Sequence, residues 1–385
     1  MGLDQRTLES LVNDNKDNAQ AEDGFAAGQN LYDGTTAGAS ALVLKDMALD
    51  QAFFQVSGGT TFFPTFQRFV DYYSPTYMDQ HSVAGFDGVD ATFPSGASPT
   101  WEYSVYDAFG RADVIEKATA YMIVAQYVQG SLEKAVEQCI AGNSGNALNF
   151  LDDAVAFYKG QETVDGNGPF FFNLAISRCG NFGVCTSPGV APVNTDIFAE
   201  FTSLRSSLNT EAGTDCPNSA ASVTTIVNKM AIPLIQGTLR YAVFIGLDNL
   251  QDDKTKSEGA IFAASVLPYI HECSPAQATI IFDQMKPVAG TQEVDFKTVQ
   301  QAFEACYNDF DITIEDIGCY DGRFETCPTG WPTSAPSMSP PTGSPPTGSP
   351  PTGGPTSSAM IATTSTFATV AAVVAAGVMT AAFEV

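Results

Sequence analysis

The strongest constraint on the fold is a run of helical periodicity in residues 113–140, DVIEKATAYMIVAQYVQGSLEKAVEQCI. Apolar residues recur in this run every three or four positions, which is the spacing of one buried face of an α-helix. The members of this face are Ile115, Ala118, Met122, Ala125, Val128, Leu132 and Val136. A helix with such an apolar stripe needs other helices to cover it, so the run predicts a mainly helical protein.

Similar spacing continues along the chain. In NALNFLDDAVAFYKG at 146–160, apolar positions again repeat at three and four, and Gly160 is a natural helix stop. Further helices are predicted at 196–208, 222–250, 258–271 and 297–307. Residues 55–105 differ, because they are rich in Gly, Pro, Ser and aromatic residues with little periodicity. That composition predicts loops or short strands.

The helical region contains an internal repeat. VQGSLEKAV at 128–136 and IQGTLRYAV at 235–243 share Gln, Gly, Leu, Ala and Val in the same places. With a small gap, DAVAF at 153–157 then aligns with EGAIF at 258–262. Each half is therefore predicted to be a long helix carrying the (V/I)QG(S/T)L motif, followed by a helix headed by a carboxylate. We predict an internally duplicated helical bundle.

Eight cysteines suit four disulfides, although the sequence leaves 105 connectivities open. Cys179–Cys185 and Cys319–Cys327 are spaced to close short local loops. Neither pair has the CxxC spacing of a zinc site, so metal binding through thiolates is not predicted. A disulfide framework indicates an extracytoplasmic protein. The opening residues MGLDQRTLES do not show the basic and apolar regions of a secretory signal peptide.

The composition changes sharply after Cys327. Residues 329–358 repeat a PPTGS unit, which cannot form a packed core and predicts an extended stalk. Residues 359–383 are apolar and uncharged, so they fit either a transmembrane segment or a GPI-anchor signal, and both alternatives remain open. Residues 1–328 are then a globular extracellular head, with pseudo-repeats at about 113–220 and 221–328. A head on a stalk anchored to the membrane is a cell-surface layout.

The charge balance is strongly acidic, with 17 Lys and Arg against 43 Asp and Glu and a formal net charge of −26. Such a surface repels nucleic acid and attracts cations. The motifs HExxH, GxSxG, GxGxxG and Walker A are absent, as is an EF-hand loop, and there are only two histidines. We therefore expect neither an enzyme nor a nucleic-acid-binding protein.

A site for a hard cation is better supported. Ferric iron prefers carboxylate and phenolate oxygens, with an occasional imidazole. These groups gather in DYYSPTYMDQH at 71–81, at the aligned repeat positions Asp153 and Glu258, and in PYIHEC at 268–273. The candidate ligands are Asp153, Glu258, Tyr158, Asp152, His271, Tyr77 and His81.

Each candidate also has a purely structural interpretation. The two aligned carboxylates are also explained as charges that complement helix N-termini, and Tyr158 as a core residue with a hydrogen-bonded hydroxyl. Arg240 is a candidate to hold an anion such as carbonate, with an ordinary salt bridge as its alternative. Because Pro75 interrupts a regular helix, residues 71–81 predict an aromatic turn, which at best adds one or two ligands to a site completed by the repeat helices.

Several segments resemble one family. LDDAVAFYKG (151–160), RCGNFGVC (178–185), IQGTLRYA (235–242), EGAIFAASVLPYI (258–270) and IEDIGC (314–319) are similar to segments of the algal low-iron-inducible periplasmic proteins. That family includes the high-CO2-inducible periplasmic protein and the iron-starvation-induced phytotransferrins. The resemblance implies a cell-surface protein that captures Fe3+ together with carbonate or bicarbonate for high-affinity uptake under iron limitation. It also implies endosomal cycling and endocytic or reductase partners.

The chain departs from the family pattern in one half. The family's acidic position carries over to Asp153 and Glu258, but the aromatic doublet Phe157–Tyr158 of the first half becomes Phe262–Ala263 in the second. The number of metal sites therefore stays open. The alternative function is an acidic cell-surface adhesion or cell-wall protein without a specific iron site.

Overall fold

A computed structural model describes residues 2–14, 21–36, 42–93, 100–160 and 170–320. They belong to the first of two units of the chain, Met1–Pro336. The stalk predicted at 329–358 and the apolar segment predicted at 359–383 lie outside the described residues. Among the residues that are described, no helix is both long and apolar enough to cross a membrane.

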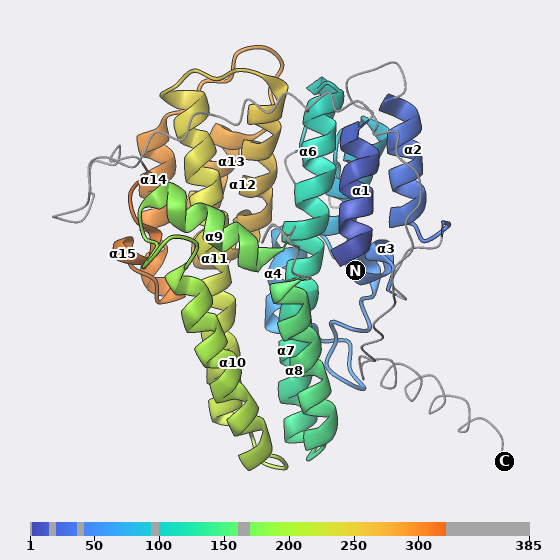
Figure 1. The fold of residues 1–385 in the computed structure, drawn as a ribbon, viewed down its shortest axis with the longest axis vertical. Helices are drawn as coiled ribbons and strands as arrows, with labels where there is room; N and C mark the ends of the chain where they lie inside the picture. Colours follow the sequence, from blue (N-terminus) through green and yellow to red (C-terminus); the bar gives the residue numbers. More distant parts are fainter. Residues whose placement is uncertain (1, 15–20, 37–41, 94–99, 161–169, 321–385) are drawn as a thin grey trace, which may run out of the picture. The chain divides into compact units, whose positions relative to one another are not determined.

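The described part of the chain is mainly helical, which confirms the predicted fold class (Figure 1). Its only β-pairs are isolated bridges such as Ala91 with Trp101. The helices are α1 (Gly2–Asp14), α2 (Ala21–Tyr32), α3 (Leu44–Leu49), α4 (Pro64–Tyr72), α5 (Tyr77–Asp87), α6 (Ala108–Ala118), α7 (Val124–Ile140), α8 (Ser144–Lys159), α9 (Phe171–Phe182), α10 (Pro192–Thr210), α11 (Pro217–Gly246), α12 (Asp253–Cys273), α13 (Pro275–Met285), α14 (Phe296–Glu304) and α15 (Ile314–Ile317).

The helix predicted from residues 113–140 is the continuous rod formed by α6, a π-helical turn at Thr119–Ile123, and α7. Its apolar face is buried, as the spacing predicted; Ile115 and Leu132 are fully inaccessible to solvent. The helices predicted at 196–208, 222–250, 258–271 and 297–307 correspond to α10, α11, α12 and α14.

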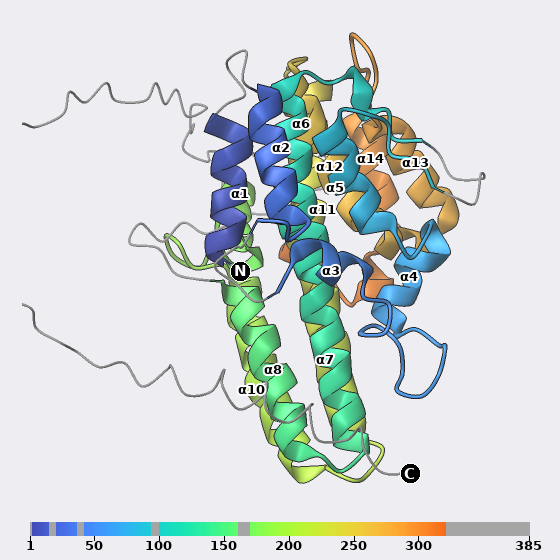
Figure 2. The same cartoon turned by 90° about the vertical axis from the view of Figure 1, so that its right-hand side faces the viewer.

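Both copies of the repeated motif lie in the first helix of a helical hairpin. The first copy is in α7, which packs along α8, and the second is in α11, which packs along α12. Figure 2 shows α7 and α8 side by side, with α10 next to them. The order of elements in each half therefore agrees with the predicted repeat. The carboxylates do not head the second helices, however, because α8 begins at Ser144 and α12 at Asp253.

The glycine of the repeated motif makes room for an aromatic ring. A Cβ atom on Gly237 would lie 2.4 Å from Cδ1 of Phe262, and one on Gly130 would lie 2.8 Å from Cδ1 of Phe54. Such distances are shorter than any van der Waals contact, so only glycine lets the ring pack against the helix backbone. In the second half the ring comes from the EGAIF segment itself, whereas in the first half it comes from outside the repeat.

The prediction of loops and short strands for residues 55–105 was wrong where α4 and α5 lie, whereas most of the other described residues of this region are irregular and include isolated β-bridges. Pro75 lies in the short link between them, where it interrupts neither helix. The helix α5 escaped detection because it is buried on several sides, so apolar and polar residues do not alternate along it. The stretch 71–81 is thus the end of one helix, a link and the start of another.

The cysteines of the described residues are disulfide-bonded, as the even cysteine count predicted. Cys139–Cys216 joins the end of α7 to the start of α11, and Cys273–Cys306 joins the end of α12 to the second residue after α14. Cys179–Cys185 closes the predicted local loop. Cys319 is also disulfide-bonded, whereas Cys327, its predicted partner, lies outside the described residues.

Candidate functional site

The predicted ligands of the first half lie apart from one another. Asp152 and Asp153 are exposed on α8, and Asp152 forms an ion pair with Arg205 on α10. Tyr158 is buried, and its hydroxyl donates a hydrogen bond to Oδ1 of Asn194 at 2.6 Å. Its packing against aromatic rings therefore fits the structural interpretation, a core tyrosine with a satisfied hydroxyl.

The predicted ligands of the 71–81 stretch belong to a buried aromatic cluster. The Tyr77 hydroxyl donates to the carbonyl oxygen of Ala264 at 2.9 Å. His81 Nδ1 lies 2.7 Å from the Tyr103 hydroxyl, and burial lowers the pKa of His81 to about 3. Both side chains are fully inaccessible to solvent. An incoming metal ion has no direct access to either, so we assign them to the core.

His271 lies in the last turn of α12 and is partly exposed, with its ring edge-on to Tyr72 at a centroid distance of 5.3 Å. Glu258 lies three and a half turns earlier on the same helix and is 8% exposed. The electrostatic neighbours of Glu258 are Lys117 and Asp113, whereas Asp153 interacts with Asp152 and Tyr127. The repeat pair Asp153 and Glu258 therefore has separate surroundings.

Glu258 belongs to a cluster of buried charges between α1, α6, α9, α11 and α12, which we call the Lys117 cluster. The Lys117 ammonium lies 3.9 Å from Oε1 of Glu258 and also pairs with Glu116. The cluster comprises Glu9, Asp113, Glu116, Lys117, Tyr121, Arg178, Arg240 and Glu258. The side chains of Glu258, Lys117 and Glu116 keep exposed fractions of 11%, 15% and 20%, so solvent reaches the cluster.

The pKa values of the acidic groups in the Lys117 cluster are shifted in different directions. Burial and the negative charge of Glu258 raise the pKa of Asp113 well above its usual range. Burial and the charge of Glu116 raise the pKa of Glu9 to about 7. Burial opposes ionisation of Glu116 too, but the neighbouring ammonium of Lys117 outweighs it and lowers the pKa of Glu116. The neighbouring cations thus do not keep all the carboxyl groups of the site ionised, because the pKa values of Asp113 and Glu9 are raised while that of Glu116 is lowered.

Lys117 is the cation of this group of acids. Burial alone would lower the pKa of its ammonium, but Glu116, Glu258, Tyr121 and Asp113 together raise it well above its usual value. Oδ2 of Asp113 is buried and has no hydrogen-bond partner in the part of the chain that the structure describes. A buried carboxylate oxygen without a donor is costly, which marks this edge of the cluster as incomplete.

An aromatic stack forms one side of the cluster. The ring of Phe262 is stacked with the rings of Tyr121 and Tyr241, at centroid distances of 5.5 and 5.8 Å. The Arg178 guanidinium lies 4.9 Å from the centroid of Phe262. Gly237 is what allows this ring to sit against α11, so the repeated motif supports the cluster directly.

Two arginines complete the cluster. Burial, followed by the charge of Arg240, lowers the pKa of Arg178 to about 10. Arg240 Cζ lies 5.0 Å from the centroid of Phe244, and no ion pair of Arg240 with an acidic residue occurs within the described ranges. The Nε atoms of both arginines are buried and without a hydrogen-bond partner among the described residues. Two neighbouring guanidinium groups with free donors form a site suited to a small anion.

The helix backbone is also irregular at the Lys117 cluster. The π-helical turn Thr119–Ile123 contains Tyr121 and interrupts the rod formed by α6 and α7. Gln5 of α1 donates to the Thr119 hydroxyl at 2.9 Å, while that hydroxyl donates to the Ile115 carbonyl at 2.8 Å. Single π-helical turns inside α-helices are frequent at functional sites, because the extra residue redirects side chains.

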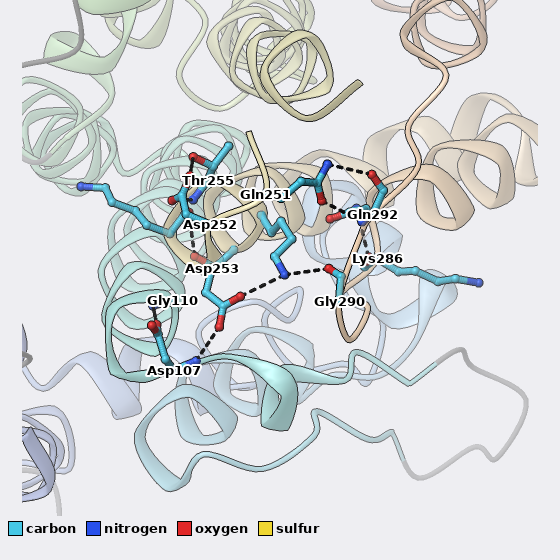
Figure 3. Close-up of polar contacts among 12 residues, drawn as sticks. Asp107, Gly110, Gln251, Asp252, Asp253, Thr255, Lys286, Gly290 and Gln292 are labelled. Atoms are coloured by element: carbon cyan, nitrogen blue, oxygen red, sulfur yellow. Dashed lines mark hydrogen bonds and ion pairs between the residues drawn. The ribbon is translucent and has the colours of Figure 1, made fainter. Parts of the chain in front are cut away.

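A polar network beyond the cluster fixes the position of α6 relative to α12 (Figure 3). Asp107 caps α6 by accepting from the Gly110 backbone N–H, and its own N–H donates to Oδ2 of Asp253, the first residue of α12. Asp253 in turn pairs with Lys256, which donates to the Gly290 carbonyl. These contacts hold the beginnings of α6 and α12 together, and with them Asp113 and Glu258 in the following turns.

The sequence did not single out most members of the Lys117 cluster. Asp113, Lys117 and Tyr121 follow one another at intervals of four, which places them on one helix face. That spacing could have indicated a polar site on the helix, but the run was interpreted from its apolar residues only. Only Glu258 and Arg240 were predicted, and both lie in the cluster as neighbours of Arg178.

Another group of potential ligands, Cys139, Glu211 and Cys216, does not form a metal site. The two sulfur atoms form a disulfide, so neither is available as a thiolate. The Glu211 carboxylate already accepts hydrogen bonds from the backbone N–H groups of Asn218 and Ser219 at the start of α11.

Comparisons with protein-family models, with curated proteins and with solved structures found no match for this chain.

Proposed function

We propose that the Lys117 cluster binds a hard trivalent cation, ferric iron, together with a small anion such as carbonate. The observation that carries this proposal is that Asp113, Glu258 and Tyr121 supply carboxylate and phenol oxygens around one charge centre. Ferric iron prefers such anionic oxygen ligands. The proposal retains Glu258 from the predicted ligand set and replaces the others with residues of α6 and its π-helical turn.

The two arginines support the second part of the proposal. Carbonate offers several acceptor oxygens, and the buried Nε atoms of Arg178 and Arg240 need acceptors. An anion between the guanidinium groups and the metal would also reduce the repulsion that contributes to the lowered pKa of Arg178. This arrangement gives Arg240 the anion-binding role predicted from the sequence.

Lys117 occupies the place of a cation when no metal is bound. Its ammonium is 3.9 Å from Glu258, so a metal ion that binds this carboxylate has to displace it. Binding also has to remove the proton from the Tyr121 phenol, whose pKa burial raises to about 12, and from the Asp113 carboxyl group. Metal binding should therefore release protons and weaken steeply as the pH falls.

At the scale of the cell, the proposed role is capture of ferric iron at the cell surface for uptake under iron limitation. The resemblance of the repeat segments and the predicted anchor at 359–383 support this role. Iron release in an acidic endosome would follow from the proton dependence of the site. Endocytic or reductase partners and a membrane-anchored, extracellular head belong to the same proposal.

The test is a spectroscopic titration of the full chain with ferric iron and bicarbonate, because iron bound by a tyrosinate has a visible charge-transfer band. We expect a band in the unaltered protein, and a loss of affinity of about tenfold or more for Asp113→Asn and Glu258→Gln. Tyr121→Phe should abolish the band. Asp153→Asn is the matched control, since it changes the aligned carboxylate of the other repeat and should leave binding unchanged.

Two results would overturn this proposal. If the protein stays colourless and calorimetry detects no tight binding of ferric iron, the acidic adhesion or cell-wall alternative is favoured, and calcium binding becomes the next measurement. If Asp153→Asn weakens binding and Glu258→Gln does not, the iron site lies on α8 and the Lys117 cluster is structural.

A further inference from the structure

A cleft with a few charged side chains lies on another part of the molecule and shares no residue with the Lys117 cluster. It is a cleft of about 680 Å³ between α4, α7, the first half of α11 and the end of α12. We call it the Arg68 cleft, after the only basic residue that lines it among the described residues. Its volume falls within the roughly 300–1,000 Å³ range of sites for small organic molecules.

Arg68 is held rigidly but is not satisfied. Its side chain is 8% exposed, and its guanidinium carbon lies over the Tyr269 ring, 4.5 Å from the centroid. Nε lies 3.2 Å from Oε2 of Glu272 without the alignment of a hydrogen bond, and Nη1 has no partner in the described part of the chain. The hydroxyl of Tyr269 pairs with Gln129, which fixes the ring beneath the guanidinium. A buried guanidinium with free donors calls for an acceptor from a ligand.

Carboxylates also line the cleft, and one of them, Glu272, is already the ion-pair partner of Arg68. Glu133 is 8% exposed, and its Oε1 accepts the Thr65 backbone N–H at 3.1 Å. Glu272 and Asp309 lie at the cleft as well, and Glu137 is already paired with Lys134. The excess of negative charge excludes a purely anionic ligand and favours one that also carries an ammonium group.

The remaining wall is apolar. Val136, Ile140, Val223 and Phe310 line the cleft, and Ile140 is 52% exposed. An apolar group placed on this wall would leave water, which stabilises a complex by roughly 25 cal/mol for each Å² buried. The cleft thus offers a donor for a carboxylate, acceptors for an ammonium group, and an apolar surface.

We propose that the Arg68 cleft binds an amphipathic zwitterion of the size of a short apolar peptide. Its carboxylate would accept from Arg68, its ammonium would face Glu133 and Glu272, and its side chains would cover Val136 and Ile140. This site would act independently of the metal site, because the two share no residue, although both use α11 and α12.

The test is isothermal calorimetry of the full chain with leucyl-leucine, without added metal. We expect binding of one dipeptide, weakened about tenfold or more by N-acetylation, which removes the ammonium, and likewise by C-terminal amidation, which removes the carboxylate. Arg68→Met and Glu133→Gln should each weaken binding similarly. Glu293→Gln, the same chemical change on an exposed carboxylate outside the cleft, should not.

Three results would overturn the proposal: no binding of leucyl-leucine, equal binding of the doubly blocked dipeptide, or unchanged binding by both cleft variants. The blocked dipeptides are measured on the unaltered protein, so the test does not depend on whether Arg68→Met folds. Because no metal is present, failure here is distinct from failure of the iron proposal.

Discussion

The ammonium nitrogen of Lys117 lies 3.9 Å from Oε1 of Glu258, so a lysine of α6 neutralises the carboxylate that the repeat alignment contributes from α12. This pair connects the two helices at the centre of the buried charge cluster. It also makes Lys117 a competitor of any cation that binds there, which leads to a first prediction.

Lys117→Met should destabilise the metal-free protein by about 3 kcal/mol, because it leaves Glu116 and Glu258 without their cation. The same variant should bind ferric iron about tenfold or more tightly, since no ammonium has to be displaced. Urea unfolding measures the first effect, and competition with ferric nitrilotriacetate measures the second. Lys229→Met, which removes a surface pair with Asp196, is the control. Unchanged iron affinity in Lys117→Met would exclude a site at the ammonium position.

Gly237→Ala should destabilise the protein by roughly 1–3 kcal/mol, because the new methyl group would overlap the ring of Phe262. Gly180→Ala is the matched control. It also lies in a helix, but a Cβ there meets nothing within 4 Å, so it should stabilise the protein by up to about 1 kcal/mol. Urea midpoints compare the two. Equal effects would mean that the ring moves aside at no cost.

Glu133 should make stability fall with rising pH. Burial raises its pKa from 4.5 to about 7, so the folded protein holds this proton more tightly than the unfolded chain. The stabilisation is complete well below pH 4.5 and is lost as the pH rises through about 7, by on the order of 3 kcal/mol. Glu133→Gln should remove this part of the dependence. The measurement is the free energy of unfolding at pH 4.5 and pH 7.5 for both proteins. If the free energy of unfolding changes by the same amount between the two pH values in both proteins, Glu133 is not the source of the pH dependence.

Loss of the Cys139–Cys216 disulfide should cost more than loss of Cys179–Cys185. The two bridges span 77 and 6 residues. The longer loop restricts the unfolded chain more, and loop-closure entropy gives about 4.5 kcal/mol for it against about 2.4 kcal/mol for the shorter one. Thermal unfolding of the two paired Cys→Ala variants compares them. A larger loss for the short loop would mean that native packing around Cys179 contributes more to stability than the restriction of the unfolded chain.

The sequence identified the long helices correctly, because their apolar faces follow the helical period over many turns. It failed for α5, where burial on several sides removes the contrast between polar and apolar residues. It also placed ligands at Asp153 and Tyr158 from alignment alone. In the structure, Asp153 lies on the exposed face of α8. Tyr158 is buried, and its hydroxyl donates a hydrogen bond to Asn194.

The sequence alone was enough to predict the helical class, the presence of disulfides and the duplicated QG motif, and it singled out Glu258 and Arg240 as candidate site residues. These features are local or repeat at fixed intervals, so they can be recognised along one chain. The tertiary structure alone decided that Asp113, Lys117 and Arg178 join them, because helices far apart in sequence bring those side chains together. It also placed Arg68 and Glu133 in a separate cleft, since only packing shows which donor atoms of a guanidinium lack an acceptor.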